Sequence, residues 1–440
     1  MRSRFSHEET MNYLADTIDK QRRSFEDEIG SYLGIEFLSH PIFTRLDNVS
    51  FLGLVNYLMD IPTELRYTRY LHSLGVAHLT LRYCQNLSLP RKETLIALIA
   101  ALLHDAGHGP FSHSSELILL WRSGYRKGHQ IHKNKIENLL NDRYSSLPSV
   151  LTKPFSNTGV LAELIYWIIQ GLRPKNLEGE VRNHLDNFLT IFSSNNLFNN
   201  PFCPDTFDGD NRGCQTLREA FDFDLLDPEL LIDYISGYGE PLITDSKGSR
   251  MIDKFTRLQN RLYEEVFYID RLRAAEAMFT RSVECIYQPG FTTLDDDMLI
   301  TKIKKNITSA HIWEQLKSKY LFKPLSVLDA NELHRALASF PGIRGSGDKF
   351  KKSKKNIEEM LARRLNIQQE FVILYRFEPL DWNPYNLFFG APKSRSVHKN
   401  LLEIKIKESH GKPQIFREGK IKKNEEDYKK FIDVYIPPNP

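Results

Sequence analysis

The stretch of residues 91–113, RKETLIALIAALLHDAGHGPFSH, joins an apolar segment to a cluster of ionisable side chains. Residues 91–103 contain no Gly or Pro and carry apolar side chains around most of a helical circumference, which predicts a helix buried on nearly all sides. His104, Asp105 and His108 follow directly. Because burying such groups is costly unless they are paired or bind a ligand, the end of this helix is a candidate functional site.

The composition is that of an ordinary water-soluble globular protein, with 41% hydrophobic and 26% charged residues. A length of 440 residues predicts two or three domains, or one large helical body with an appendage. The formal net charge of +3 is too small to indicate nucleic-acid binding by itself. No apolar run approaches the roughly 18 residues of a membrane helix, and the polar first residues lack the pattern of a secretory signal. We therefore expect a cytoplasmic protein.

The four cysteines are scattered without C-x-x-C spacing. This spacing indicates neither a disulfide framework nor a zinc knuckle, so we expect free thiols.

The chain reads as mostly α-helical up to about residue 320. Helices are expected at residues 134–144, at residues 160–172, where Gly171 supplies a stop signal, and as one long helix over residues 253–287. Residues 176–218 are rich in Asn, Pro, Asp and Gly, which favours a loop over a helix.

The composition changes after about residue 339. The string PGIRGSGDKFKKSKKN predicts a flexible Gly- and Lys-rich connection, and the runs EFVILYRF, YNLFFG, LLEIKIKE and FIDVYI predict short strands. We expect the lysines of the connection to be solvated rather than bound to phosphate; they are Lys349, Lys351, Lys352, Lys354 and Lys355. The expected parts are an N-terminal helical segment 1–37, a helical core 38–340 and a small α+β appendage 341–440.

The cluster after the apolar helix has the chemistry of a metal site. Two imidazoles, those of His104 and His108, and the carboxylate of Asp105 converge within about one helical turn. Neutral imidazole and carboxylate are common ligands of divalent metals, and a metal would offset the cost of burying Asp105. Alternatively, His104 bonds a backbone carbonyl and Asp105 caps a turn. The segment RYTRYLHSLGVAHLTL, with Arg69 and His72, and the aspartates of PDTFDGD favour the metal.

The strings RYLHSLGVAHL, LIALIAALLHDAGHGPFSH and PDTFD resemble the scattered ligand motifs of the HD-domain phosphohydrolases. More narrowly, they resemble the deoxynucleoside triphosphate triphosphohydrolases, including the animal enzyme with a sterile alpha motif and the bacterial dGTP-hydrolysing enzymes. The resemblance is specific at the motifs and covers most of the chain weakly. It implies a mostly α protein with an HD-domain core, a dNTP as substrate and a homo-oligomer, whereas a nucleic-acid partner has only weak support from the basic segment and no membrane partner is expected.

The resemblance also implies the ligands of one divalent metal ion, whose identity among Mn, Fe, Mg, Zn, Co and Ni it does not indicate. The four implied ligands are His72, His104, Asp105 and Asp205. Asp208 or Asp210 is the alternative to Asp205, because the family string D-x-x-D-Y has Gly209 here in place of the tyrosine. Arg69 resembles the arginine that holds a substrate phosphate, and its guanidinium suits that task.

Further catalytic roles follow from the same resemblance. His108 and His113 are expected on the α-phosphate side of the site. His132 resembles the family's separate catalytic histidine, with Glu116 as its acidic partner, and His129 is the competing choice. A carboxylate beside an imidazole fixes the tautomer and supports the charged form that donates a proton.

The implied reaction is in-line attack of a metal-polarised water on the α-phosphorus, releasing a deoxynucleoside and intact triphosphate. The family's sugar-reading glutamine is replaced by Phe51, so the sugar and base preference stays open. Two alternatives remain, a phosphodiesterase or phosphatase of the same family acting on another nucleotide, and a nucleotide-sensing binding module.

Overall fold

The structure is a computed structural model of the chain, and it describes most residues up to 324 and fewer beyond that point. The described residues are 7–116, 118–119, 133–171, 174–191, 198, 202–236, 242–243, 246–267, 269–324, 347–366, 368–376 and 432–436. The chain divides into two compact units. The first comprises Met1–Ser112, Gly128–Leu262 and Thr292–Asp296, and the second comprises His113–Lys127, Tyr263–Phe291 and Asp297–Pro440. The expected boundaries near residues 38 and 341 stay predictions.

In its described residues the first unit is helical, apart from a short antiparallel pairing of β1 (Ile235–Ser236) with β2 (Leu242–Ile243) and an isolated antiparallel bridge between Ser50 and Thr68. Its helices are α1 (His7–Leu33), α2 (Ile35–Leu38), α3 (Pro41–Thr44), α4 (Val55–Leu58), α5 (Arg69–Asn86), α6 (Arg91–Leu103), α8 (Lys133–Arg143), α9 (Ser149–Thr152), α10 (Thr158–Gln170), α11 (Gly179–Ile191), α12 (Pro204–Phe221), α13 (Pro228–Asp233) and α14 (Ser246–Leu262). Short 3-10 turns lie at Arg45–Asn48, Thr63–Leu65, Ser112–Ser115 and Tyr144–Ser146.

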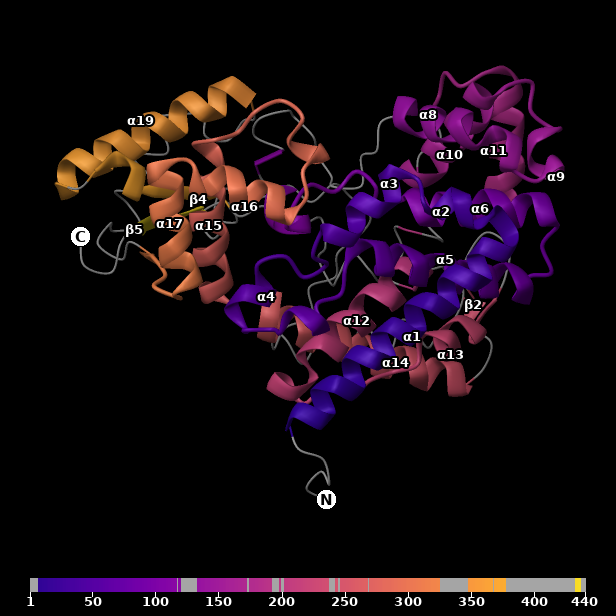
Figure 1. Cartoon of the computed structure of the whole chain (residues 1–440), viewed down its shortest axis with the longest axis horizontal. Coiled ribbons are helices and arrows are strands. Elements are labelled where there is room, and N and C mark those ends of the chain that lie inside the picture. The colour runs from indigo at the N-terminus through magenta and orange to yellow at the C-terminus, as the bar shows by residue number, and fades with distance from the viewer. Residues whose placement is uncertain are drawn as a thin grey trace, which may run out of the picture. The chain divides into compact units, whose positions relative to one another are not determined.

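Helix α6 lies at the centre of this unit. It has the predicted bounds, and every side chain from Thr94 to Leu103 is buried, because apolar residues cover nearly its whole circumference. It packs against α5 and α10, and α5 also contacts α1, α12 and α13; Figure 1 shows α1 running along α5. The predicted helices at residues 134–144 and 160–172 are confirmed as α8 and α10, and Gly171 ends α10 in the left-handed conformation with φ 60°.

Where the structure describes residues 176–218, most of them are helical rather than the expected loop. They contain α11 and most of α12, although Asp, Asn and Gly are poor helix formers. Pro204 occupies the first turn of α12, where its missing N–H costs nothing. Phe207, Cys214 and Leu217 are fully buried and lie along one helical face. Tertiary packing of that face therefore overrides the weak local propensity.

The predicted single helix over residues 253–287 is interrupted. Helix α14 ends at Leu262, a π-helical turn occupies Tyr263–Phe267, and α15 (Asp270–Glu284) starts after Ile269, whose backbone is extended. The chain passes from the first compact unit to the second between Leu262 and Tyr263. Amphipathic periodicity continues on both sides of the break, so the pattern alone cannot reveal that the two apolar faces serve different cores.

The second unit combines helices with a small antiparallel sheet. Its elements are α15, α16 (Asp296–Lys304), α17 (Ile307–Lys317), β3 (Lys323–Pro324), α19 (Gly347–Leu365), β4 (Ile373–Arg376) and β5 (Ile432–Ile436), with 3-10 turns at Phe291–Thr293 and Gln369–Phe371. The strand order is β3-β5-β4. The predicted strand runs EFVILYRF and FIDVYI are confirmed as β4 and β5, whereas YNLFFG and LLEIKIKE lie outside the described residues. The predicted mostly α fold with a small C-terminal α+β region is confirmed.

The Lys-rich connection is helical from Gly347 onward, as α19. Lys352 and Lys355 are exposed, as expected, but Lys354 is only 4% exposed. Its Nζ lies 3.0 Å from Glu284 Oε2 and 2.7 Å from Glu358 Oε1. The expectation of a solvated lysine is wrong at this position, because two carboxylates pair with the charge inside the second unit.

Two further expectations concern the whole chain. Cys84, Cys203, Cys214 and Cys285 are free thiols, as predicted. Among the helices of the described residues, none is both long and apolar enough to span a membrane.

Candidate metal-binding site

The N-terminal turn of α5 supplies the first two side chains of the site. Thr68 caps the helix, since its hydroxyl accepts the backbone N–H of Leu71 over 3.2 Å. Arg69 and His72 are three residues apart, so they share one face of the helix, and both are buried.

The C-terminal end of α6 supplies the next two. His104 continues the helical backbone, and its Nδ1 donates to the carbonyl of Ala101 over 2.7 Å. The structure therefore contains the backbone bond considered as an alternative to metal binding. That bond does not compete with a metal, because it directs the other ring nitrogen, Nε2, toward Asp105 and Asp205.

The loop after α6 is held from several directions. Arg45 donates to the carbonyls of Ala106 over 3.1 Å and His108 over 2.9 Å. Asp296 accepts the backbone N–H of Phe111 over 2.7 Å. Phe111 has φ 60°, a left-handed conformation that non-glycine residues adopt only where surrounding contacts enforce it.

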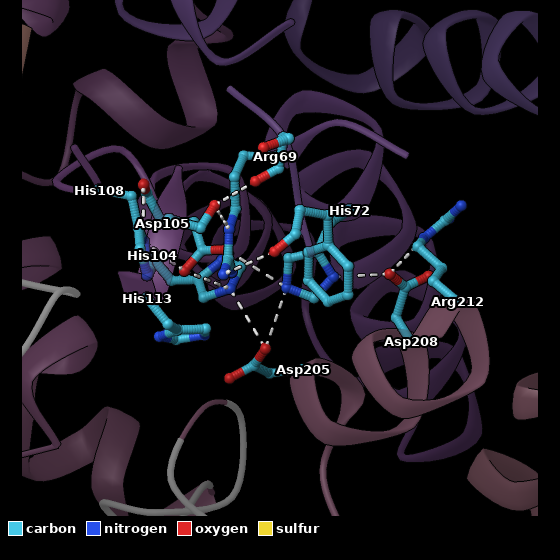
Figure 2. A network of polar contacts seen from close by, with 12 residues as sticks. Arg69, His72, His104, Asp105, His108, His113, Asp205, Asp208 and Arg212 are labelled. Atoms are coloured by element: carbon cyan, nitrogen blue, oxygen red, sulfur yellow. Dashed lines mark hydrogen bonds and ion pairs between the residues drawn. The ribbon is translucent and has the colours of Figure 1, made fainter. Parts of the chain in front are cut away.

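Four donor groups converge where these elements meet α12 (Figure 2). His72 Nε2 lies 3.1 Å from Asp205 Oδ1 and 3.4 Å from Asp105 Oδ2. His104 Nε2 lies 3.4 Å from Asp205 Oδ1 and 3.4 Å from Asp105 Oδ1. The structure thus brings together the four residues that the sequence resemblance implied as ligands.

The donor set fits a divalent ion in spacing as well as in chemistry. Ligand atoms of His72, His104 and Asp205 all lie within 4.8 Å of one another. Two ligand atoms about 2.1 Å from one ion are about 3.0 Å apart at a right angle and about 3.4 Å apart at a tetrahedral angle. The observed separations of 3.1 and 3.4 Å fall in this range.

The guanidinium of Arg69 is buried and hydrogen-bonded to Asp105. Its Nη1 donates to Asp105 Oδ2 over 2.6 Å, its Nε donates to Ser112 Oγ over 2.8 Å, and its guanidinium lies 4.6 Å from the ring centroid of Phe51. The expected contact with a substrate phosphate stays a prediction.

Opposite charges shift the pKa values of these groups strongly. Burial alone raises the pKa of Asp105 and Asp205, but Arg69 beside the former and His104 beside both outweigh it and hold both pKa values below the usual range. Burial alone lowers the pKa of His104, but the two carboxylates outweigh it and raise the pKa to about 9. The two carboxylates thus favour a positive charge between them, and a divalent cation can supply that charge in place of a proton on His104.

The two alternative aspartates of α12 have other partners. Asp208 Oδ2 lies 2.7 Å from His72 Nδ1 and accepts from Arg212 Nε over 2.6 Å. Asp210 accepts from Gln259 Nε2 over 2.6 Å, and burial raises its pKa to about 7. This geometry favours Asp205 as the fourth ligand, a role that stays a prediction.

The expected catalytic groups are described only in part. His108 is fully buried, and its Nδ1 lies 3.1 Å from Asp105 Oδ1. His113 is half-exposed, and its Nδ1 lies 2.7 Å from Glu116 Oε1. His132 and its competitor His129 lie outside the described residues. Among the described residues, Glu116 pairs with His113, and its predicted pairing with His132 stays a prediction.

Three contributors to the site were missed by sequence reasoning. Phe198 stacks on His104 with ring centroids 5.2 Å apart, and nothing in its Asn-rich surroundings indicates this. Arg212 follows Asp208 by four residues, the spacing of a helical ion pair, and would have been found had α12 been predicted as a helix. Gly75 packs directly against that pair.

Comparisons with known proteins find a family match and relatives over parts of this chain. Residues 69–180 match the family model described as HD domain. An uncharacterized protein of Methanocaldococcus jannaschii is 23% identical over 346 residues, covering 74% of this chain and 62% of that protein. A deoxynucleoside triphosphate triphosphohydrolase SAMHD1 homolog of Dictyostelium discoideum is 29% identical over 121 residues, covering 26% of this chain and 22% of that protein. The chain thus spans less than two thirds of either relative.

The fold has solved counterparts as well. A crystal structure of a phosphohydrolase from Bacteroides thetaiotaomicron matches with a TM-score of 0.51 and 17% identity, covering 79% of this chain and 86% of that chain. At this identity the match shows the fold alone. The family match alone places an HD domain at residues 69–180 of this chain.

Proposed function

We propose that the chain is a metal-dependent phosphohydrolase that cleaves deoxynucleoside triphosphates into a deoxynucleoside and inorganic triphosphate. The observation that carries the proposal is the convergence of His72, His104 and Asp205 at the spacing of ligands around one ion, with Asp105 in contact with both histidines. The similarity to a relative named as a deoxynucleoside triphosphate triphosphohydrolase homolog supports this substrate class. Neither the base nor the identity of the ion follows from these residues.

Some residues of the site would bind the ion and the phosphate, and others orient the side chains that do so. A bound divalent ion would polarise a phosphate oxygen and lower the pKa of a nearby water. The buried donors fix its place, and the Nδ1–H of His104, bonded to the carbonyl of Ala101, keeps that ring from rotating. Arg69 neutralises Asp105, and its guanidinium has the planar geometry that suits a phosphate oxygen.

Proton delivery to the departing 5′-oxygen needs an acid whose charged form is supported. His113 has a carboxylate partner in Glu116, which fixes its tautomer and favours the imidazolium. His132 is the acid that the sequence resemblance favours. We assign the proton donation to His132 and treat His113 as the competing residue.

Product analysis tests the proposal. Purified protein is incubated with manganese and each of the common NTPs and dNTPs, and the products are separated by ion-exchange chromatography. Release of intact triphosphate with a deoxynucleoside supports the proposal, whereas orthophosphate or a linear dinucleotide points to a phosphatase or phosphodiesterase of the same family. Binding of nucleotides without any turnover, in wild type and in His104→Gln alike, would favour a nucleotide-sensing module.

The described residues of the site favour a nucleotide as partner. The expected homo-oligomer and the cytoplasmic location stay predictions, and light scattering coupled to gel filtration checks the former.

A further inference from the structure

We propose that Asp208 and Arg212 form a positioning pair that orients His72 toward the metal, with Gly75 leaving the space that the pair requires. The proposal rests on the proposed function insofar as His72 is a metal ligand. It assigns to Asp208 a positioning role. On the sequence alone, Asp208 was an alternative metal ligand to Asp205.

The two ring nitrogens of His72 face different carboxylates. Nδ1 lies 2.7 Å from Asp208 Oδ2, and Nε2 lies 3.1 Å from Asp205 Oδ1 (Figure 2). An ionised carboxylate can only accept a hydrogen bond, so a proton on Nδ1 is donated to Asp208. With that proton in place, the lone pair of the neutral ring lies on Nε2, the atom that faces the other donors. Metal-binding histidines are commonly fixed in this way by a carboxylate that does not touch the metal.

Arg212 holds the carboxylate in turn. Its Nε donates to Asp208 Oδ2 over 2.6 Å, its Nη1 donates to Gln21 Oε1 over 3.3 Å, and its guanidinium lies 4.9 Å from the ring centroid of Tyr67. Asp208 and Arg212 are 4% and 2% exposed. The same oxygen, Oδ2, thus accepts from both Arg212 and His72, which leaves the carboxylate little freedom to turn.

Gly75 explains why a pair of this size fits beside α5. It follows His72 by three residues inside the helix, where glycine is less stabilising than alanine. A Cβ at this position would lie 2.0 Å from Asp208 Oδ1 and 2.5 Å from Arg212 Nη2. Any side chain at residue 75 therefore displaces the carboxylate from its contact with His72.

The competing interpretation is that the pair is an ordinary helical ion pair between residues four apart, with no effect on His72. Such a role would change the stability of α12 and leave metal affinity unchanged. The dissociation constant of the metal therefore separates the two interpretations better than activity does.

The experiment measures the dissociation constant of Mn²⁺ for the full chain by isothermal titration calorimetry, with the melting temperature of each variant recorded in parallel. Asp208→Ala is expected to raise the constant by about 10- to 100-fold. Asp208→Asn should restore part of the affinity, because its amide oxygen still accepts the Nδ1–H of His72. The matched control is Glu358→Gln, a buried carboxylate of α19 that pairs with Arg281 and Lys354 in the second unit, and it should leave the constant unchanged.

Gly75→Ala is an independent test of the proposal. It removes no polar group, yet it should weaken Mn²⁺ binding because its Cβ would displace the Asp208 carboxylate. An unchanged constant in a folded Asp208→Ala variant overturns the proposal, as does an equal loss in Glu358→Gln. If Asp208→Ala does not fold, unchanged constants in Asp208→Asn and Gly75→Ala overturn it. Wild-type protein that binds no Mn²⁺ contradicts the proposed function itself, and the positioning role falls with it.

Discussion

Arg69 and Asp105 form a buried ion pair, with Nη1 and Oδ2 2.6 Å apart and side chains only 2% and 0% exposed. The pair links the start of α5 to the residues that follow α6, two helices that pack against each other. A charge taken out of water is tolerated only while its partner is present. Removing either partner alone therefore affects the fold before it affects any chemistry.

The first prediction concerns this pair. Arg69→Met should lower the free energy of unfolding by about 3–5 kcal/mol, because it removes the guanidinium 2.6 Å from a fully buried carboxylate and leaves imidazoles beside it. The double variant Arg69→Met/Asp105→Asn should lose clearly less than the sum of the two single changes. Urea denaturation in the presence of a chelator measures all four proteins. Additive losses would show that the two charges do not depend on each other.

The second prediction concerns removal of the metal. A chelator should abolish hydrolysis and lower the melting temperature, since a ligand that binds only the folded chain stabilises it by about 2.7 kcal/mol at a hundred times its dissociation constant. Added Mn²⁺ should restore both. In His104→Gln, Mn²⁺ should no longer raise the melting temperature. Turnover that resists the chelator in wild type would contradict the assignment of these residues.

The third prediction is a pH dependence of stability outside the site. His78 Nδ1 lies 2.5 Å from Glu28 Oε2, and its Nε2 lies 3.3 Å from Glu229 Oε1, a carboxylate that also pairs with Arg82. Burial alone lowers the pKa of His78, but the two glutamates outweigh it and raise the pKa above 6.5. The folded chain therefore binds this proton more tightly than the unfolded chain does.

The sign follows from that difference. The contribution of His78 is fully present below pH 6.5 and is lost as the pH rises through the raised pKa of the folded state. Melting temperatures at about pH 6 and about pH 9 should differ more in wild type than in His78→Gln. An equal difference in both proteins would show that this histidine is not the titrating group.

Much of the fold could be predicted because the sequence of its central helix is by itself typical of a buried helix. Residues 91–103 have an apolar circumference and no breaker, and α6 has those bounds. Helix α12 could not be predicted in this way, because its Asp, Asn and Gly residues are local helix breakers placed there by contacts with the site. Gly209 is an example, since a Cβ at this position would lie 3.3 Å from Phe51 Cζ and 3.6 Å from His72 Cε1.

The residues of the site could be predicted where they lie within short, recognisable sequence motifs. His104 and Asp105 are adjacent, and His72 and Asp205 come from strings with a specific resemblance. Arg212 depends on a helix that was not predicted, and the burial of Lys354 depends on carboxylates from two helices of the second unit. Periodicity reports which face of a helix is apolar, but it does not report which charges meet across helices.

The last prediction concerns the proton donor. His132→Ala should lower turnover by about 10²- to 10⁴-fold, the usual range for general acid catalysis, with little change in Mn²⁺ affinity. Glu116→Gln should have a milder effect of the same kind, because it removes the charge that supports an imidazolium and keeps a hydrogen-bond acceptor. His129→Ala is the control for His132, and a rate defect confined to it would identify His129 as the acid.

The bond between His113 and Glu116 allows a sharper test of which histidine the carboxylate serves. If Glu116 supports His113, the effects of His113→Ala and Glu116→Gln on kcat should overlap, and the double variant should be no slower than His113→Ala alone. If Glu116 supports His132, the effects of His132→Ala and Glu116→Gln on kcat should overlap in the same way. The factors by which His113→Ala and Glu116→Gln lower kcat should then multiply in their double variant. Single-turnover rates of the three single and two double variants decide between the histidines, and independent effects in both double variants would show that Glu116 assists neither.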